Sequence, residues 1–432
     1  MVLLFLILFL GGVASIPYSF QSSSILYKFG TDRLLLRSGK IFGLMAFSLV
    51  LFQVASGTRL KFPDRIFSLN KVFRFHRICG LVIAGLAITH PILILASENM
   101  LFIPFKMRYW PEFTGVFLLM GLICTGVVST LRKVMGLPFH LWFKMHQWVA
   151  PVLLALLFVH VLFVSETFET GLPHTLVFLS TGICGILWIR HKIRPFLSKP
   201  AFEVTSVEPA GKEAWRLNLV RVSGRAFQYH SGQFGFFRFQ SPNISSEEHP
   251  FSISSSPTRP DGIELVVREG GDWTRLVSRI EPGTRCRVDG PYGLFSHAQC
   301  PKGSELIMIA GGIGITPMLS MVRYMADTRD DRKTLLIWSS KTREHDFFQN
   351  EFEGFGHSLI NLRVIRVFTR DTEAFGENGR LDKPRLKRLV SGMTTSSYVY
   401  ICGPPEMMKD TGKWLIELEF LKNRIFTENF GL

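Results

Sequence analysis

The chain has 432 residues, of which 47% are hydrophobic and only 19% are charged. A soluble globular protein has about 25% charged residues, and this apolar content excludes a disordered or fibrous protein. The net charge of +15 is uneven, with +12 in residues 1–197 and +3 in residues 198–432. The basic residues of the first part lie in short clusters between long apolar runs, which is typical of a membrane protein and not of a nucleic-acid-binding protein.

Apolar runs recur through the first half of the chain. A transmembrane helix needs about 20 consecutive apolar residues. Uncharged runs of this kind occupy residues 1–27, 41–58, 78–97, 113–131, 145–165 and 170–189. We therefore predict a bundle of six transmembrane helices in an integral, multi-pass membrane protein.

The segments between these runs predict the orientation of the bundle. Basic residues predominate in three of them, residues 59–77, 132–144 and 190–199. The segments 98–112 and 166–169, which alternate with these, are neutral or acidic. Because positively charged segments tend to remain in the cytoplasm, we expect the three basic segments and the second half of the chain on the cytoplasmic side.

The segment 28–40 does not follow this alternation. It is basic, with only Asp32 against four Lys and Arg residues, yet its place in the order puts it outside. Two explanations remain open. Either the first run is a signal-like segment and not a span, or the basic residues serve an anionic group at the outer face.

Histidines recur at one spacing in two of the apolar runs. His76 and His90 lie 14 residues apart at the third run, and His146 and His160 lie 14 apart at the fifth. Fourteen helical residues return to within about 40° of the same face and rise about 21 Å. Because the third and fifth helices run in the same direction, His76 lies level with His146, and His90 lies level with His160. Each pair could ligate an iron from both sides, as in a haem.

Histidine in an apolar helix also has a simpler interpretation, since a single one is often a satisfied core residue. Two pairs at identical spacing favour the ligand interpretation, because ionisable residues inside a membrane helix are usually functional. His140 lies six residues before His146 and so falls on another face, and His174 lies beside an outer loop. We expect neither to be a ligand.

The six cysteines do not form a metal-binding motif. They are Cys79, Cys124, Cys184, Cys286, Cys300 and Cys402, and no two are spaced as Cys-x-x-Cys. The sequence therefore gives no support for a zinc site or an iron–sulfur cluster built on such a pair, and a disulfide framework is not expected at this density.

The second half has the pattern of two smaller folds. Residues 201–299 contain short alternating stretches such as 217–222 and 263–268, broken by Gly, Pro and Ser, which predict an antiparallel β-barrel. From residue 305, apolar strands alternate with helical stretches, which predicts an α/β fold with a parallel sheet. The predicted strands are Leu306–Ala310, Thr334–Trp338, Leu362–Phe368 and Tyr398–Cys402.

A glycine-rich turn follows the first of these strands. Leu306–Ala310 runs into Gly-Gly-Ile-Gly-Ile-Thr-Pro at 311–317, and a helical stretch follows. Glycines let the backbone approach a pyrophosphate, and the helix N-terminus offers amides and a favourable dipole. The alternative is a tight strand–helix turn without a ligand.

Further motifs occur in order along the second half. They are His-Pro-Phe-Ser at 249–252, Gly-Asp-Trp-Thr at 271–274, Asp-Gly-Pro-Tyr-Gly at 289–293, Cys-Gly-Pro-Pro at 402–405 and Glu-Asn-Phe at 428–430. Together with the glycine-rich turn, they make the second half resemble the ferredoxin–NADP reductase superfamily. With its two histidine pairs, the whole chain resembles the ferric reductase and NADPH oxidase family over nearly its full length.

The resemblance implies an FAD site. His249, Pro250, Phe251 and Ser252 would line the FAD, with Phe251 against the flavin ring and Ser252 near its reactive edge. The pyrophosphate would be held by Arg268, Gly271, Trp273 and Thr274.

The resemblance also implies a nicotinamide nucleotide site. Its phosphates would bind at Gly311, Gly312, Gly314, Thr316 and Pro317, and its nicotinamide beside Cys402, Gly403 and Pro404. The implied catalytic residues are Cys402, Ser252 and Phe430, the last matching an aromatic residue that covers the flavin, although Gly431 and Leu432 follow it here. A packed strand-end thiol is the alternative for Cys402.

The choice of nucleotide depends on basic residues near a 2′-phosphate. Thr369 and Arg370 match the position where NADP-using relatives place a hydroxyl and an arginine, and Lys341 and Arg343 could help. A solvated basic edge is the alternative. We expect NADPH, without excluding NADH.

We predict three domains: a ferric reductase-like transmembrane domain with two haems b at 1–196, an FAD-binding barrel at 197–300 and an NAD(P)-binding α/β domain at 301–432. Flavin accepts two electrons and releases them singly, so it must stand between a hydride donor and haem. The resemblance implies electron transfer from cytosolic NAD(P)H to an external acceptor, either dioxygen, giving superoxide, or a ferric or cupric complex.

Two other functions remain open at this point. The chain could instead donate electrons to quinone or to a periplasmic redox partner. A metal-transport or sensor membrane protein, with the histidine pairs as ligands of a divalent metal, is an alternative of another class.

Overall fold

A computed structural model describes residues 2–58, 69–197, 201–224, 226–259, 261–345, 348–371 and 377–429 of the chain. Phe430, predicted to cover the flavin, lies outside the described residues. The chain divides between Arg194 and Pro195 into two compact units, which are described separately below.

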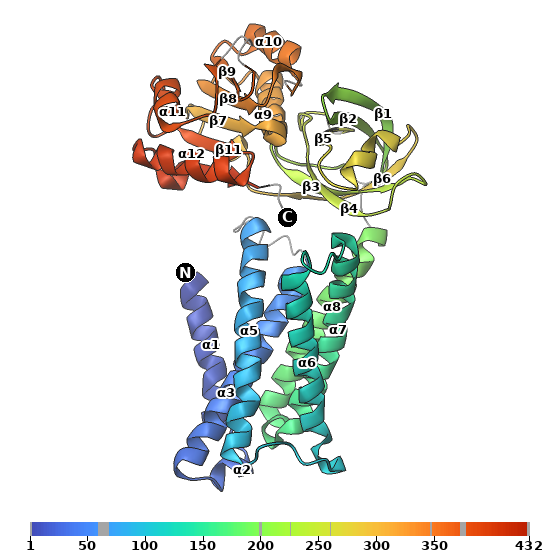
Figure 1. The fold of residues 1–432 in the computed structure, drawn as a ribbon, viewed down its shortest axis with the longest axis vertical. Coiled ribbons are helices and arrows are strands. Elements are labelled where there is room, and N and C mark those ends of the chain that lie inside the picture. Colours follow the sequence, from blue (N-terminus) through green and yellow to red (C-terminus); the bar gives the residue numbers. More distant parts are fainter. Residues whose placement is uncertain are drawn as a thin grey trace. The chain divides into compact units, whose positions relative to one another are not determined.

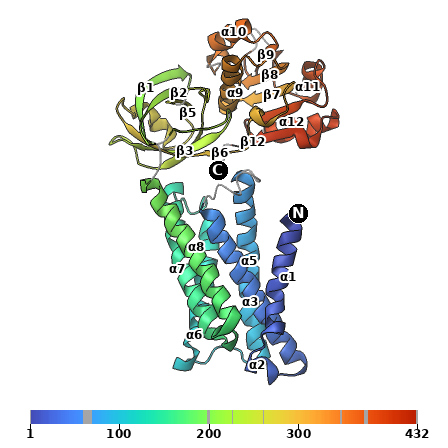
Figure 2. The same ribbon diagram turned by 180° about the vertical axis from the view of Figure 1, so that it is seen from behind.

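The first unit is a bundle of long helices that lie side by side along their lengths (Figure 1 and Figure 2). The helices are α1 (Val2–Ser19), α2 (Ser23–Leu26), α3 (Gly30–Gly57), α5 (Leu69–Ser97), α6 (Trp110–Leu131), α7 (Phe139–Val164) and α8 (Gly171–Leu197). Two short 3-10 helices, η1 (Met107–Tyr109) and η2 (Glu166–Phe168), lie in the connections.

Five of the described helices, α3, α5, α6, α7 and α8, are long and apolar enough to cross a membrane. They contain the second to sixth predicted runs, which are confirmed as helices. The first run, 1–27, is not one helix, because α1 ends at Ser19 and α2 begins at Ser23. A sixth span therefore stays a prediction that rests on the 18 residues of α1.

The segment 28–40, which the charge pattern assigned to a loop, belongs mostly to α3. Gly30 has φ +56°, a left-handed conformation that suits glycine, and Asp32 lies in the first helical turn, where a negative charge is favoured. The cations of this segment find partners in the preceding loop, as Lys40 donates to Ser22 Oγ at 2.5 Å and Arg33 donates to Gln21 Oε1 at 3.3 Å. The helix can therefore begin before its apolar part.

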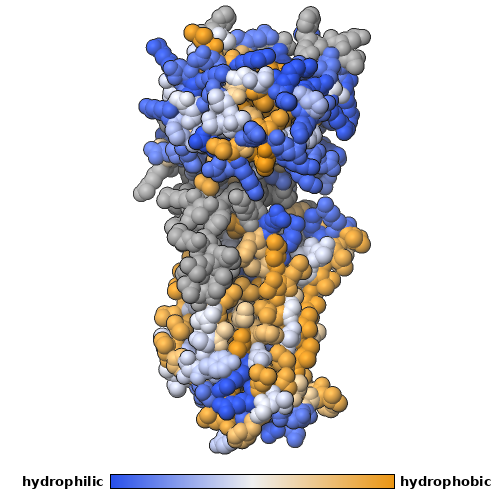
Figure 3. Space-filling model, turned by 90° about the vertical axis from the view of Figure 1, so that its left-hand side faces the viewer, coloured by the Kyte–Doolittle hydropathy of each residue, from blue (hydrophilic) through white to orange (hydrophobic). Residues whose placement is uncertain are grey.

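The outer surface of the helical unit is strongly hydrophobic (Figure 3). Large apolar side chains point outward, including Leu81 with 68%, Ile186 with 66% and Ile92 with 58% of the side chain exposed. Water would not favour such a surface, and a lipid bilayer would. The unit thus has the surface of a membrane-spanning bundle.

The second unit begins with an antiparallel sheet. Its strands are β1 (Ala201–Gly211), β2 (Ala214–Ser223), β3 (Phe234–Gln240), β4 (Glu248–Ser252), β5 (Gly262–Arg268) and β6 (Arg285–Tyr292), in the order β4-β3-β6-β1-β2-β5. The two predicted strands are confirmed within β2 and β5. A bridge between Ile253 and Leu265 brings the end of β4 back to β5. The sheet is confirmed, and its closure into a barrel stays a prediction.

A parallel sheet follows in the same unit. Its strands are β7 (Leu306–Gly311), β8 (Thr334–Ser340), β9 (Leu362–Phe368), β10 (Glu377–Asn378), β11 (Tyr398–Cys402) and β12 (Ile425–Glu428), in the order β10-β9-β8-β7-β11-β12. All four predicted strands are confirmed, and their neighbours pair in parallel. The helices are α9 (Ile315–Thr328), α10 (Gln349–Ser358), α11 (Lys383–Val390) and α12 (Pro405–Glu417).

Alternation along β7 explains how helices cover both faces of this sheet. Leu306 and Met308 pack in one core with residues of α9 and α10, while Ile307 and Ile309 pack in another with residues of α11 and α12. Successive side chains of a strand point to opposite faces. A strand buried on both sides therefore reads as a continuous apolar run, which is the pattern that predicted it.

A buried arginine joins the two sheets of the second unit. Arg323 of α9 donates two hydrogen bonds to Glu351 of α10, at 2.6 and 2.9 Å. Its Nη1 also reaches into the antiparallel sheet, where it donates to Glu264 Oε1 at 2.8 Å and to the carbonyl of Ser254 at 3.0 Å. These carboxylates raise the pKa of Arg323, so its charge is kept. Because Arg323 and Glu351 lie on helices that cover the parallel sheet while Glu264 lies on β5, the arginine links the helical layer of the α/β fold to the antiparallel sheet.

We expect Arg323→Ala to destabilise the contact between the sheets by about 3–5 kcal/mol, because it leaves two partly buried carboxylates without their shared cation. Hydrogen exchange of peptides from β5 and α9 measures the change. Arg363→Ala on β9 is the control, since Arg363 is exposed and a surface change of this kind costs less than about 0.5 kcal/mol. Equal protection in the two variants would contradict the role of Arg323.

Candidate functional site

The four predicted histidines form two pairs inside the helical unit. His76 and His90 lie on α5, and His146 and His160 lie on α7. The ring centroids of His76 and His146 are 6.1 Å apart, and those of His90 and His160 are 6.3 Å apart. The ring planes of the two pairs cross at 71° and 77°. The structure therefore brings together the residues that the spacing pairs.

Hydrogen bonds orient both rings of the His90–His160 pair. The Nδ1 of His90 donates to the carbonyl of Gly39 at 2.7 Å, and that of His160 donates to the carbonyl of Pro111 at 2.9 Å. With the proton on Nδ1, each ring keeps the Nε2 lone pair for a metal. Metal-ligating histidines usually donate their other nitrogen to a carbonyl or carboxylate in this way.

Glycines on the neighbouring helices leave room for these two rings. A Cβ atom on Gly43 of α3 would lie 2.9 Å from His90 Nδ1. A Cβ on Gly115 of α6 would lie 2.5 Å from His160 Cε1. Any larger residue would push the imidazoles out of place.

The donor set fits an iron porphyrin. A metal ion lies about 2 Å from an imidazole nitrogen, so an ion shared by two opposed rings separates their centroids by roughly 6 Å. Both pairs have this separation. Among the described residues, no group of three or more His, Cys, Asp or Glu could hold a metal. Two axial nitrogens with the other positions left to a macrocycle match this set.

The remaining histidines of the helical unit have other surroundings. The Nδ1 of His174 donates to the carbonyl of Phe168 at 2.8 Å, and the ring lies 4.6 Å from that of Phe178. His174 is therefore engaged locally. The side chain of His140 lies outside the described part of the structure.

In the second unit, β4 presents a row of aromatic rings. His249 lies over Trp273 with centroids 4.2 Å apart, and Phe251 lies 5.9 Å from Trp273. His249 and Phe251 are half-buried, and Pro250 lies between them. Burial lowers the pKa of His249 although Glu247 opposes it, so the ring is neutral at pH 7. Such a partly open aromatic strand can accept a flat ring.

The side chain of Trp273, a residue predicted to help hold the pyrophosphate, is enclosed by the protein. Its side chain is only 6% exposed, and its Nε1 donates to the carbonyl of Ser245 at 2.9 Å. The indole therefore packs in the core of the antiparallel sheet and supports the ring of His249. The role of the surrounding motif in binding the pyrophosphate stays a prediction.

The glycines before Trp273 are held by a hydroxyl. The amides of Gly270 and Gly271 donate to Thr274 Oγ1 at 3.0 and 2.9 Å. Thr274 begins a 3-10 helix, η3 (Thr274–Arg279), and not the α-helix that an anion site would favour. Arg268, at the end of β5, is exposed beside this turn.

The glycine-rich turn after β7 packs against the turn after β11. A Cβ on Gly314 would lie 2.3 Å from the carbonyl oxygen of Cys402, and one on Gly311 would lie 2.7 Å from Pro404 Cδ. A Cβ on Gly403 would lie 2.9 Å from Gly311 Cα. These glycines are needed for the close approach of two loops, whatever else they bind.

Gly312 is required for a different reason. Its φ of +54° lies in the left-handed region, and a Cβ there would lie 3.4 Å from Arg268 Nη1. The arginine at the end of β5 thus reaches the glycine-rich turn between β7 and α9. Thr316 and Pro317 are buried in the first turn of α9, where the Thr316 hydroxyl donates to the carbonyl of Ile313 at 3.0 Å.

The ends of both sheets meet around Gly293. A Cβ on Gly293 would lie 3.2 Å from the ring of Phe234 and 4.0 Å from Glu428 Oε2. Phe234 pairs with Ser252 across β3 and β4, and Glu428 pairs with Cys402 across β12 and β11. Gly293 therefore lies between Phe234, the strand partner of Ser252, and Glu428, the strand partner of Cys402.

Glu428 is a site candidate that the sequence reasoning did not select. It is 6% exposed at the end of β12 and pairs in register with Cys402. A nearly buried carboxylate beside a thiol at the carboxyl edge of a parallel sheet is typical of a functional site. A signal was present in the sequence, because Glu428 is the one charged residue of the short strand β12 and the first residue of the motif Glu-Asn-Phe.

Thr369 and Arg370 lie beside Lys341 and Arg343, as predicted for a basic edge. The Thr369 amide donates to the carbonyl of Ser340, and the Arg370 amide donates to that of Lys341, both at 2.9 Å. Lys341, Arg343 and Arg370 are exposed. Three cations therefore gather where β8 and β9 end, at the same edge as the glycine-rich turn.

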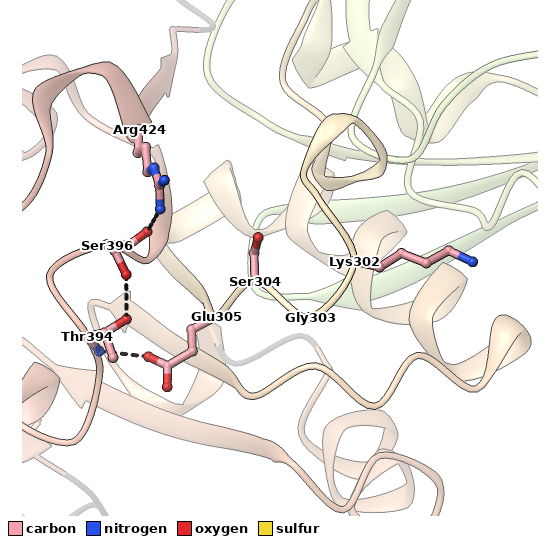
Figure 4. Close-up of a pocket in the computed structure, with 7 residues that line it drawn as sticks. All are labelled: Lys302, Gly303, Ser304, Glu305, Thr394, Ser396 and Arg424. Carbon is pink, nitrogen blue, oxygen red and sulfur yellow. Dashed lines mark hydrogen bonds between the residues drawn. The ribbon is translucent and has the colours of Figure 1, made fainter.

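A polar hollow of about 360 Å³ lies at the other edge of the parallel sheet (Figure 4). It is lined by Lys302, Gly303, Ser304, Glu305, Thr394, Ser396 and Arg424. These residues precede β7, β11 and β12, whereas the predicted nucleotide residues follow the strands. Glu305 accepts from the Thr394 amide at 2.7 Å, so its carboxylate is engaged within the hollow. The hollow is not part of the nucleotide site.

Comparison with known families gives three consecutive matches. Residues 42–157 match the ferric reductase like transmembrane component, residues 200–296 match an FAD-binding domain, and residues 308–413 match an oxidoreductase NAD-binding domain. Three of the four paired histidines lie in the first range, and His160 follows it. FAD and a nicotinamide nucleotide are therefore the cofactors of the second unit.

Individual relatives match part of the chain. The gamma subunit of sulfhydrogenase 1 from Pyrococcus furiosus is 30% identical over 210 residues, which cover 44% of this chain and 71% of that protein. The reductase component of propane 2-monooxygenase from Mycolicibacterium goodii is 26% identical over 245 residues, 53% of this chain and 66% of that protein. The chain thus spans about two thirds of the length of these relatives.

Solved structures show likeness in fold. A flavohemoglobin from Malassezia yamatoensis, with bound FAD and heme, matches with a TM-score of 0.52 and 17% identity over 93% of this chain and 98% of that chain. A ferredoxin NADP+ reductase from Neisseria gonorrhoeae, with bound FAD and NADP, matches with a TM-score of 0.47 and 22% identity over 52% of this chain and 98% of that chain.

We expect Cys402 to resist alkylation in the folded protein. Its side chain is fully buried, and burial beside Glu428 raises its pKa well above that of a free thiol, so the reactive thiolate is scarce up to pH 9. Mass spectrometry after iodoacetamide treatment of native and denatured protein measures the modification. Cys300, which is only partly buried, serves as the comparison, and complete native labelling of Cys402 would contradict the burial.

Proposed function

The chain belongs to the ferric reductase and NADPH oxidase family, and from this premise we propose that it moves electrons from NAD(P)H across a membrane to an acceptor on the other side. The observation that carries the proposal is the pair of facing imidazoles at each of two levels, 6.1 and 6.3 Å apart, inside a bundle with a lipid-compatible surface. Two such levels suit two haems b, held by His76 with His146 and by His90 with His160.

The cofactors supply the redox chemistry, since flavin accepts a hydride's two electrons and releases them singly, and haem iron accepts one electron at a time. The residues of the chain bind and orient. The carbonyls of Gly39 and Pro111 accept hydrogen bonds from the Nδ1 atoms of His90 and His160, which would leave each Nε2 free to hold a haem iron. No acid–base or nucleophilic group is needed for this reaction class.

The second unit would place the nicotinamide against the flavin. Ser252 at the end of β4, and Cys402 and Glu428 at the ends of β11 and β12, would border the two reacting rings. His249, Pro250 and Phe251 on the open face of β4 would line the flavin, and Phe430 would cover it. Arg268 reaches both the turn after β5 and Gly312, so it can attract the phosphates of either nucleotide.

We propose that the basic ends of the helical unit and the second unit face the cytoplasm. Residues 59–77, 132–144 and 190–199 carry an excess of Lys and Arg, whereas the alternating segments 98–112 and 166–169 are neutral or acidic, and only the basic segment 28–40 departs from this alternation. Positive segments favour the cytoplasm. NAD(P)H would then be used inside the cell, and the His90–His160 pair would lie toward the outside.

The external acceptor would have to take up one electron at a time. Dioxygen, which gives superoxide, and a ferric or cupric complex both accept single electrons outside the membrane. Consumption of NAD(P)H with each acceptor in turn, together with superoxide trapping, separates them. Turnover with ferric chelates and none with dioxygen would exclude the oxidase reaction, and turnover with quinone alone would exclude both.

The purified chain should show the sharp Soret band of bis-imidazole haem and contain two haems per polypeptide. Gly115→Val should remove about half of this haem, because the added side chain enters the space of His160. Haem per chain from a pyridine haemochrome assay measures the loss, and His90→Ala should give the same value.

Gly126→Ala is the matched control on the same helix, since a Cβ at Gly126 meets nothing within 4 Å. It should retain both haems. A colourless wild-type protein would contradict the proposed function. Full haem content in Gly115→Val and His90→Ala would exclude the His90–His160 pair as ligands.

Arg370→Ala should raise the KM for NADPH about tenfold or more and leave that for NADH unchanged. A charge-assisted hydrogen bond to a 2′-phosphate contributes about 1.5–3 kcal/mol, and NADH has no such phosphate. Steady-state kinetics with both nucleotides measures this. Arg363→Ala, an exposed arginine on β9 away from the strand end, is the control, and equal effects on both nucleotides would refute the assignment.

A further inference from the structure

One of the four paired imidazoles lacks the hydrogen bond that orients the others. The Nδ1 atoms of His90 and His160 donate to backbone carbonyls at 2.7 and 2.9 Å, and that of His76 lies 3.5 Å from Ser56 Oγ. The Nδ1 of His146 is buried and has no hydrogen-bond partner among the residues that the structure describes. Something else must set the plane of this ring if it is to hold a metal.

The ring of His146 stacks on an indole instead. Trp142 lies one helical turn earlier on α7, and the two ring centroids are 5.3 Å apart with planes inclined by only 26°. Residues four apart share a helix face. Of the four paired histidines, His146 is the one that the described residues support by such a parallel stack.

The indole is itself fixed to the neighbouring helix α6. Its Nε1 donates to Ser129 Oγ at 3.1 Å, and the guanidinium of Arg132 lies 5.6 Å from the ring centroid. The Ser129 hydroxyl donates in turn to the carbonyl of Thr125 at 2.6 Å. The indole of Trp142 is therefore held in place by residues of α6 and the following turn, and it packs against His146 on its own helix α7.

The plane of an imidazole is soft without such support. The terminal torsion of histidine is broad, so the ring turns easily about its Cβ–Cγ bond. A ligating histidine is normally held by a hydrogen bond from its second nitrogen. A parallel aromatic contact, worth about 0.5–1.5 kcal/mol, can select one plane when that bond is missing.

We propose that Trp142 is a positioning residue for His146 and sets the crossing angle of the His76–His146 ring planes, which is 71° in the structure. The proposal rests on the proposed function, because it assumes that this pair holds a haem. Trp142 acts through His146 and need not touch the haem itself. The two pairs thus differ in how their rings are oriented. Hydrogen bonds orient both rings of the His90–His160 pair, and an aromatic stack orients His146 in the other pair.

The test compares three variants of the full-length protein loaded with haem. Trp142→Leu removes the ring, and Trp142→Phe keeps an aromatic face against His146. Trp148→Leu is the control, because Trp148 lies on the same helix but is exposed and contacts Trp188 at 5.5 Å, not a paired histidine. Haem per chain and the electron paramagnetic resonance spectrum of the oxidised protein are measured, since the g values of a low-spin bis-imidazole iron depend on the angle between the ring planes.

We expect two low-spin ferric signals in the wild type, of which Trp142→Leu shifts or broadens one and leaves the other unchanged. Trp142→Phe should restore the wild-type signal, and Trp148→Leu should not alter it. In a His160→Ala background, which keeps only the His76–His146 pair, the effect of Trp142→Leu should persist. Loss of one haem in Trp142→Leu that Trp142→Phe restores is the same result in a stronger form.

Wild-type signals in Trp142→Leu would overturn the proposal, and so would an equal change in Trp148→Leu. An equal change in Trp142→Leu and Trp142→Phe would show that the aromatic stack does not position the ligand. These outcomes differ from failure of the proposed function, in which the wild-type protein itself has no bis-imidazole signal.

Discussion

Two pairs of imidazoles facing each other between α5 and α7 are the constraint on which the helical unit depends. The rings of His90 and His160 lie close to the backbones of neighbouring helices, and a glycine at each contact, Gly43 and Gly115, leaves room for the ring. The same helices also supply the carbonyls of Gly39 and Pro111 that orient these rings. One packing arrangement thus provides both the space for the two imidazoles and the hydrogen bonds that orient them.

The second unit depends on contacts between its antiparallel sheet and its α/β part. Arg323 ties them together through Glu264 and Glu351. The close contact of Gly314 with the carbonyl of Cys402 holds the two nucleotide turns side by side. The arrangement of these two turns therefore depends on contacts within the protein, which require glycine for close backbone packing.

Much of the fold follows from local pattern. The strands Leu362–Phe368 and Tyr398–Cys402 have the predicted bounds. The second is an uninterrupted apolar run, as expected for a strand buried on both faces, whereas the first is a partly buried strand that contains two arginines. The segment 28–40 was misassigned because charge counts take no account of partners. Lys40 can lie within α3 only because Ser22, from another segment, accepts its hydrogen bond.

The sequence by itself determined the histidine pairs, since a spacing of 14 residues on two parallel helices can be read without coordinates. It also determined the order of the two nucleotide-binding sheets. Only the tertiary structure decided that Glu428 lies beside Cys402, that Trp273 is core, and that His146 relies on Trp142 where His90 relies on Gly39. Orientation and burial come from contacts between residues far apart in the chain, or from which side of a helix meets a neighbour, and neither is written in local composition.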